Sequence, residues 1–298
     1  MTVKAYDVVI VGGGAAGLSA ALVLGRARRR VAVVDAGAPR NAPAGHMHGF
    51  LSRDGLPPAD LLAAGRDELA MYGVDVIDDD VLDAEPGFVV GTAAGRMLSA
   101  RRLLLATGAV DVLPAIPGAR ERWGRDFLHC PYCHGWEVRG EPLGVVGTVA
   151  GAAEHALLLR QWSEDVIFFS HTHPATADEH AVLVSSGIEI VDGAVTRLVV
   201  ENDRLRGVEL DDGREVSRTA LFMRPTLEPR GAELIESLGC ELDNTGFVRA
   251  DRDGRTSVAG VWSAGNVSNP RAQVITAAGE GSAAAISINN DLVQEDSR

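Results

Sequence analysis

The residues with the clearest chemical potential are two cysteines, Cys130 and Cys133, within the string HCPYCH at residues 129–134. A cysteine pair this close is the shortest unit that can cycle between a dithiol and a disulfide. A neighbouring base can keep one sulfur as the reactive thiolate, and histidine, with an unperturbed pKa of about 6.5, suits that task near neutral pH. The string therefore predicts thiol–disulfide chemistry, with His134 and His129 as candidate bases.

A glycine-rich loop near the N-terminus predicts a nucleotide-binding site. Residues 8–11 (VVIV) have the length and β-branched content of a buried parallel strand, and the loop GGGAAG at 12–17 leads into a helix-like stretch at 18–25. Gly12 suits the tight turn, Gly14 lets a pyrophosphate approach the backbone, and Gly17 permits close packing of helix on strand. The next strand, 31–34, ends in Asp35, which is placed to accept the ribose hydroxyls of an adenosine. The alternative is a Gly/Ala-rich turn without a ligand.

The order of the elements predicts an α/β fold with two Rossmann-like, doubly wound, three-layer units, the second inserted into the first. In the first unit we expect a helix at 59–72, strands at 75–77, 80–84, 88–90, 97–99 and 103–105, a strand from 258 that stops at a turn by 266, and a helix at 271–292. In the second we expect a strand at 143–147, a helix at 152–162 and a strand at 166–169. The first domain is thus discontinuous, at 1–115 and 245–298, and the inserted domain at 116–244 carries the cysteine pair.

The composition excludes several classes of protein. The net charge of −13, from 28 basic and 41 acidic residues, repels nucleic acid and acidic membranes. No uninterrupted apolar run approaches the roughly 18 residues of a membrane span. Three cysteines are too few for a disulfide scaffold, and Cys240 is expected to be a small buried hydrophobe. We expect a cytoplasmic protein with a catalytic cysteine pair.

Over essentially its whole length the chain resembles the low-molecular-weight thioredoxin reductase family, in which an FAD domain from both chain ends carries a smaller inserted domain with the C-x-x-C pair. The string HCPYCHGWE at 129–137 is similar to the branch with the dithiol oxidases of holomycin, gliotoxin and related disulfide natural products. The resemblance implies FAD as cofactor and a homodimer. The residues that it implies in FAD binding are Gly12, Gly14, Ala15, Ala16, Gly17, Asp35, Ala36, Arg40, Asn41, Val81, Ala106, Thr107, Gly108, Gly265, Asn266, Ala272, Gln273 and Val274. Asn266 departs from the family's aspartate, but its carbonyl can still accept a hydrogen bond.

The inserted unit departs from the NADPH-using members at both places that hold the nucleotide. Its loop reads GTVAGA at 147–152, and Val149 stands where a glycine admits the pyrophosphate. After the next strand, the segment SHTHP at 170–174 has no arginine, and neutral histidines are poor phosphate clamps. We expect NADPH binding to be lost or weak.

The resemblance then implies an oxidase. A small-molecule dithiol attacks the disulfide at Cys130, Cys133 faces the flavin, and the electrons pass through FAD to O₂, giving H₂O₂. His134 stands at the position where the reductases have an aspartate that acts as the acid. In an oxidase, His134 would deprotonate the incoming thiol. Two alternatives stay open: a reductase of thioredoxin or another disulfide, using NADPH or another donor, and a flavin redox sensor without turnover.

Three further interpretations compete for the same residues. The letters C-x-x-C-H also match a c-type haem attachment signature, which requires export and a haem pocket. A zinc site requires further ligands at suitable spacing, so we expect no metal. We interpret His46 and His48 as groups of the active-site wall or as polar groups of a loop. Tyr132 and Trp136 either line a small-molecule pocket or serve in packing.

Overall fold

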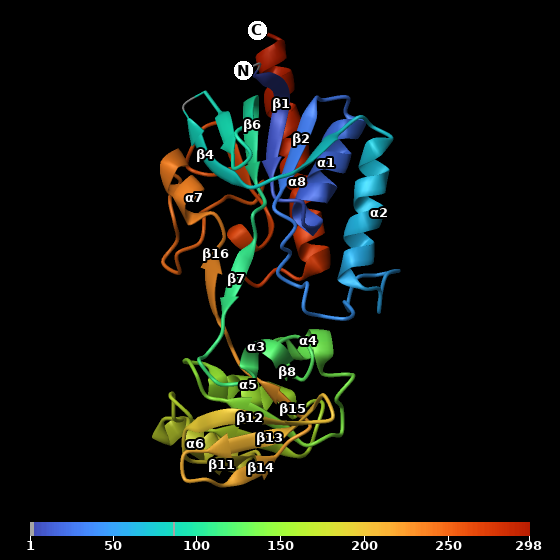
Figure 1. Ribbon diagram of the computed structural model, residues 1–298. Coiled ribbons are helices and arrows are strands. Elements are labelled where there is room, and N and C mark those ends of the chain that lie inside the picture. Colours follow the sequence, from blue (N-terminus) through green and yellow to red (C-terminus); the bar gives the residue numbers. More distant parts are fainter. Residues whose placement is uncertain (1–2, 86) are drawn as a thin grey trace.

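The computed structural model describes residues 3–85 and 87–298 of the chain. Within these ranges the chain forms two lobes, one above the other in Figure 1, with β7 and β16 running between them. The upper one, here called the large-sheet lobe, has a seven-stranded sheet in the order β3-β2-β1-β6-β5-β4, with β17 also paired with β6. Its strands are β1 (Lys4–Val11), β2 (Val31–Asp35), β3 (Asp75–Asp78), β4 (Val81–Glu85), β5 (Val89–Thr92), β6 (Met97–Leu105) and β17 (Val261–Ser263).

Both ends of the chain build the large-sheet lobe. β1, β2, β3, β6 and β17 run parallel, and β4 and β5 continue from β6 as an antiparallel meander. Its helices are α1 (Ala15–Arg26), α2 (Pro58–Ala70), α7 (Ala232–Leu238) and α8 (Val274–Asp296). The C-terminal strand and helix therefore complete a sheet that the N-terminal segment begins.

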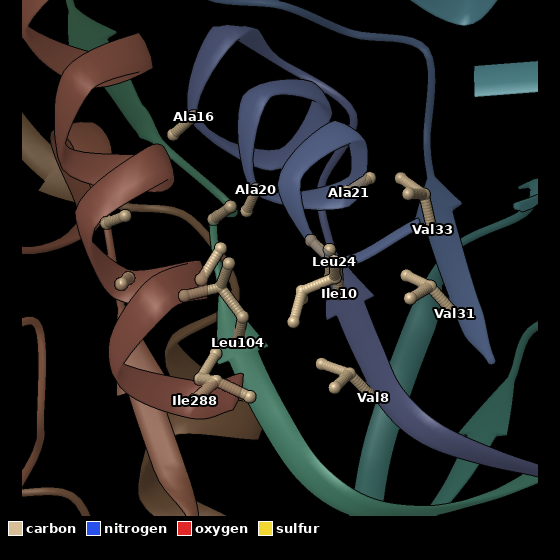
Figure 2. Close-up of a cluster of buried hydrophobic side chains, with 14 of the residues drawn as sticks. Val8, Ile10, Ala16, Ala20, Ala21, Leu24, Val31, Val33, Leu104 and Ile288 are labelled. Atoms are coloured by element: carbon tan, nitrogen blue, oxygen red, sulfur yellow. The ribbon is translucent and has the colours of Figure 1, made fainter. Parts of the chain in front are cut away.

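Apolar side chains on both faces of the large sheet explain the almost continuous hydrophobic runs in β1 and β2. Val8 and Ile10 of β1 belong to a cluster beneath α1 and α8, which Figure 2 shows. The alternate residues Val9 and Val11 belong to a second cluster with α7 on the other face. Because successive residues of a strand point to opposite faces, a strand covered on both sides is apolar at every position.

Small residues bring α1 and α8 into close contact. A Cβ atom added to Gly281 of α8 would overlap the backbone carbonyl of Ala16 in α1. A Cβ on Gly17 would likewise overlap the carbonyl oxygen of Gly12. These contacts fix the N-terminal end of α1 at the end of β1, where the glycine loop lies.

The lower lobe, here called the small-sheet lobe, has a five-stranded parallel sheet in the order β11-β10-β9-β15-β8, and beside it an antiparallel sheet β12-β13-β14. The strands are β8 (Phe127–Leu128), β9 (Leu143–Val146), β10 (Val166–Phe169), β11 (Glu189–Val191), β12 (Val195–Glu201), β13 (Arg204–Leu210), β14 (Glu215–Ser217) and β15 (Ala220–Phe222). The helices are α3 (Ala119–Arg122), α4 (Pro131–His134), α5 (Ala152–Leu159) and α6 (Ala177–Ser185). Figure 1 shows α3 and α4 on the side that faces the other lobe.

The two lobes are connected by a pair of antiparallel strands, β7 (Ala109–Val112) and β16 (Thr226–Pro229). The segment that leads into the small-sheet lobe therefore pairs with the segment that leads back from it. Val112 lies opposite Thr226, and Ala109 lies opposite Pro229.

Several expected elements have other bounds in the structure, and three of these differences have a clear physical reason. The strands expected at 97–99 and 103–105 form one strand, β6, because Arg101 and Arg102 extend their side chains to carboxylates of α8 instead of breaking the strand. The helix expected from residue 271 begins at Val274, after a turn held by the side chain of Asn266. The strand expected from 258 begins at Val261, because Gly260 has a φ of +85°.

Among the helices of the described ranges, none combines the length and the apolar character that crossing a bilayer requires.

Candidate active site

A cleft of about 310 Å³ follows the carboxyl ends of the large-sheet strands and reaches the cysteine pair. Such strand ends are where open α/β sheets bind their ligands. The cleft is lined by these residues from the predicted cofactor site: Gly12, Gly14, Ala15, Ala16, Asp35, Arg40, Asn41, Ala106, Thr107, Gly108, Gly265, Asn266, Ala272, Gln273 and Val274. Cys130, Cys133, His129, His134, His46 and His48 line it as well. Gly17, Ala36 and Val81 are outside this lining.

The glycine loop has the shape that a pyrophosphate needs. Gly12, at φ +108°, turns beside the carbonyl of Ala106 with no room for a side chain. A Cβ on Gly14, by contrast, would have no atom within 4 Å, so the backbone there is open to the cleft. No side chain caps the described N-terminus of α1, and its first turn has no acidic residue. These free N–H groups favour a phosphate, so the residues fit a dinucleotide such as FAD.

Asp35, at the end of β2, is held by a residue that the sequence analysis did not identify. Its carboxylate forms an ion pair with Arg66 of α2, and Arg66 also donates to Asp78 at 2.7 Å. An ionised carboxylate has about four acceptor positions, so Asp35 can keep this partner and still accept from ribose hydroxyls. Arg66 gives no local signal in the sequence, because its partner is far away along the chain.

Asn266 builds the turn before α8. Its side-chain amide donates to the carbonyl oxygens of Asn269 and Ala272, both at 3.0 Å, and its own oxygen accepts from Arg40 at 3.4 Å. An aspartate has no N–H group to donate. The departure from the family's aspartate therefore has a structural reason in this chain, and Asn266 still lines the cleft.

The cysteine pair lies on a single helical turn in the small-sheet lobe. Cys130 is the N-cap of α4 and Pro131 its first residue, the position where proline suits a helix. Cys130 and Cys133 form a disulfide with a Cα–Cα distance of 5.2 Å. Gly135 ends the turn against Trp162, whose ring would lie 2.9 Å from an added Cβ. The disulfide therefore lines the cleft on a turn that is held in place by its packing against Trp162.

Both histidines beside the disulfide are partly buried and neutral at neutral pH. Burial lowers the pKa of His134 below the usual range, although Glu137 opposes this effect. Burial also lowers the pKa of His129. The Nδ1 of His129 lies 3.3 Å from the carbonyl oxygen of Met223, which can only accept, so Nδ1 carries the proton and Nε2 is free to accept one.

A third histidine lies behind His129 and was not identified from the sequence. The ring of His155 in α5 meets the ring of His129 edge to face, with 6.1 Å between centroids. Neither of its ring nitrogens has a hydrogen-bond partner among the described residues. Burial lowers the pKa of His155 to about 3. Because this residue stands within an ordinary helical stretch, its sequence context gives no sign of the contact.

The second glycine loop, at 147–151, is covered by the chain itself. The backbone N–H of His173 donates to the carbonyl oxygen of Gly147 at 2.9 Å. The guanidinium of Arg224 donates to the carbonyl oxygen of Gly151 at 3.2 Å and occupies the space where a side chain on Gly151 would project. The exposed guanidinium of Arg224 is the far end of a flexible side chain and can move, so Val149 is the residue at this loop that a nucleotide would have to accommodate.

The remaining candidates lie around the mouth of the cleft. His48 lies between two carboxylates, with Nδ1 3.3 Å from Asp54 and Nε2 3.4 Å from Glu137. Within the described parts of the chain, no three metal-binding side chains are grouped as a metal site requires. Tyr132 packs edge to face on Trp162 at 5.6 Å, and Trp136 packs under Arg139. Tyr132 and Trp136 are each 65% exposed and do not line the cleft.

A redox-active cysteine pair at a dinucleotide cleft defines a disulfide oxidoreductase, and comparison with known proteins agrees. The sequence profile of the pyridine nucleotide-disulphide oxidoreductase family matches residues 6–281, and the chain belongs to that family. The solved structure of HlmI superposes with a TM-score of 0.95 at 54% identity, over 97% of this chain and 93% of that one.

Two curated fungal relatives cover almost the whole chain. The thioredoxin reductase sirT of Leptosphaeria maculans is 32% identical over an alignment of 306 positions, which covers 95% of this chain and 93% of sirT. The thioredoxin reductase aclD of Aspergillus oryzae is 32% identical, over 98% of each chain. The predicted resemblance, the α/β fold with two Rossmann-like units and an oxidoreductase activity are confirmed. The family also supports a flavin cofactor.

Proposed function

We propose that the chain is an FAD-dependent dithiol oxidase that forms a disulfide in a small natural-product dithiol. The observation that carries this proposal is the common cleft of the disulfide, the glycine loop and the two neutral histidines. The loop at 147–151 supports it further, because a nicotinamide donor would meet the side chain of Val149 where the NADPH-using members have a glycine. Electrons then enter from a thiol and leave through the flavin.

The cysteine pair performs the first half of the reaction. A substrate thiolate attacks one sulfur, which we assign to Cys130 on the family resemblance, and the Cys130–Cys133 bond breaks as the mixed disulfide forms. The electron pair of the broken bond remains on Cys133 as a thiolate. The second substrate thiol then displaces Cys130, so that the substrate has lost two electrons and two protons and the cysteine pair has gained the two electrons.

When bound, FAD would supply the two-electron chemistry by which this electron pair, with two protons, reduces O₂ to H₂O₂. The residues proposed to hold it are those that line the cleft, with Gly14 open to the pyrophosphate and Asp35 to the ribose.

The histidines handle the protons of the incoming dithiol. A thiol with a pKa of about 8.5 is mostly protonated at neutral pH and reacts only after losing its proton. His134 is neutral there because its pKa is lowered by burial, so it can accept that proton. His129, with a free Nε2, is the second candidate for the same role.

A reductase is the second candidate function, because sirT and aclD are both named thioredoxin reductases. In that direction NADPH or another donor reduces the flavin, and the cysteine pair passes the electrons to a disulfide.

The stoichiometry of aerobic turnover tests the oxidase. With dithiothreitol as the probe, we expect one O₂ consumed and one H₂O₂ formed for each dithiol oxidised, and no turnover in Cys133→Ser. The proposal fails if the wild-type protein binds FAD yet oxidises no dithiol, or if the Cys133 variant consumes O₂ as fast as the wild type.

A further inference from the structure

One short segment of the large-sheet lobe touches the other lobe and its connection at three points. This segment, residues 40–48 between β2 and α2, has no helix or strand and is here called the clamp loop. The chain between β2 and α2 forms the lower edge of the large-sheet lobe, on the side of α3 and α4 (Figure 1). Lobes of one chain by default move relative to each other. Three contacts from one loop therefore indicate that this loop restrains such a motion.

The first contact is a two-pronged ion pair. Nη2 of Arg40 lies 2.6 Å from one carboxylate oxygen of Asp111, and Nε lies 3.0 Å from the other. The side chain of Asp111 is 9% exposed, so water screens the pair little. Asp111 belongs to β7 and Arg40 lines the cleft, so the two-pronged pair sets the orientation of the connecting strand relative to the cleft.

The second contact is close backbone packing. Gly124, at φ +77°, lies against Pro43, and an added Cβ would be 2.9 Å from the carbonyl carbon and from the Cβ of Pro43. Real Cβ atoms do not come that close to backbone, so any larger residue at 124 must push the two surfaces apart.

The third contact lies just beyond the cysteine turn. Nε2 of His48 lies 3.4 Å from Glu137, which follows His134 by three residues. Asp111 and Gly124 precede the cysteine pair along the chain and Glu137 follows it. The three contacts therefore involve segments that precede and follow the cysteine pair in the chain.

We propose that Gly124 and Asp111 are positioning residues, through which the clamp loop keeps the disulfide against the flavin cleft during turnover. The inference rests on the proposed function, since it concerns electron transfer from the cysteine pair to the flavin. Thiol–disulfide exchange with a substrate needs only an accessible disulfide. Electron transfer to the flavin also needs the reacting sulfur to lie close to the flavin in the correct orientation. A small displacement therefore lowers the rate of this step strongly.

The test compares two glycines with the same backbone conformation. Gly124→Val inserts a side chain between the lobes, whereas Gly140→Val, at φ +75° with no atom within 4 Å of its Cβ, adds the same strain without the contact. Asp111→Asn weakens the ion pair without adding volume. FAD content is measured for each variant, and flavin reduction by dithiothreitol is followed anaerobically in a stopped-flow instrument.

We expect Gly124→Val and Asp111→Asn to keep FAD and to lose their disulfide to dithiothreitol at the wild-type rate, as acid-quenched thiol titration reports. Flavin reduction should be slower by about tenfold or more in both, and unchanged in Gly140→Val. In a Cys130→Ser background, the long-wavelength absorbance between the Cys133 thiolate and oxidised flavin should disappear with Gly124→Val and persist with Gly140→Val.

Flavin reduction in both clamp variants as fast as in wild type would overturn the inference while leaving the oxidase intact. Equal slowing in Gly140→Val would also overturn it, because backbone strain would then be the cause. If dithiothreitol does not reduce the flavin of the wild type at all, the proposed function fails first.

Discussion

His134 is the single residue whose removal most directly tests the proton chemistry. Because burial lowers its pKa, the imidazole stays unprotonated at neutral pH and ready to accept a thiol proton. We expect His134→Ala to keep FAD and the disulfide and to lose dithiol oxidation by about 10²-fold near pH 7. The rate should partly recover as the pH rises toward the thiol pKa of about 8.5, where the substrate ionises unaided. His180→Ala, on the exposed side of α6, is the control. If His134→Ala turns over at the wild-type rate, the base that accepts the thiol proton is His129 or solvent.

The two cysteines should differ when each is left alone. Either Cys130→Ser or Cys133→Ser should stop dithiol turnover, because no disulfide can form. With Cys133 remaining, a thiolate beside the oxidised flavin should give a long-wavelength absorbance band, and with Cys130 remaining the band should be weak. Absorbance titration with pH measures both variants. A stronger band with Cys130 would reverse the assigned roles.

Asn266 shows where residue types alone mislead. The sequence suggests a weakened cofactor ligand, whereas the structure shows an amide that donates two hydrogen bonds to the turn before α8. Asn266→Asp removes both bonds and leaves the Ala272 carbonyl unpaired beside a new charge, and it should reduce the free energy of unfolding by about 1–3 kcal/mol. Denaturant unfolding at neutral pH with excess FAD measures this. An unchanged midpoint would mean that the two bonds contribute nothing.

At the scale of elements, α5 carries a histidine that makes the fold sensitive to acid. His155 has a pKa of about 3 in the folded protein and about 6.5 when unfolded, so between these values the unfolded chain binds the extra proton. The free energy of unfolding is therefore unaffected by the titration of His155 above pH 6.5, and it decreases as the pH falls from 6.5 toward 3. From pH 6.5 to 5 the loss is about 2 kcal/mol, at 1.36 kcal/mol per unit.

The prediction is that His155→Phe, which fills the same buried site without titrating, loses less stability than wild type between pH 7 and pH 5. Urea unfolding at the two pH values, with saturating FAD, gives the comparison, and His180→Ala serves as the exposed histidine control. An identical acid loss in wild type and His155→Phe would contradict the assignment of this proton uptake to His155.

Most elements of the large-sheet lobe are predictable because their signals are local. The β1 loop and α1 combine a β-branched run, a glycine turn and an apolar helix within one stretch of sequence. The pairing of β7 with β16 is different, since their partners lie more than a hundred positions apart and each strand is short. The same holds for the contacts of Arg66, Asp111 and His155, which arise only when distant elements meet.

At the scale of the whole molecule, the two lobes divide the chemistry between them. The large-sheet lobe supplies the cofactor cleft, and the small-sheet lobe supplies the disulfide from α4. Figure 1 shows α4 on the side that faces the large-sheet lobe. Motifs at 12–17 and 129–134 predict both parts separately. Their meeting in one cleft depends on the connecting strands and the clamp loop, for which the sequence has no motif.

The central claim is that electrons enter this protein from a dithiol and not from NADPH, and anaerobic flavin reduction tests it most directly. The protein is mixed in one experiment with excess dithiothreitol and in another with NADPH, and the flavin absorbance is followed in time. We expect rapid bleaching by the dithiol and much slower bleaching by NADPH, because Val149 obstructs the second glycine loop and the segment at 170–174 has no arginine. Rapid bleaching by micromolar NADPH, with little effect of the dithiol, would contradict the oxidase and establish the reductase in its place.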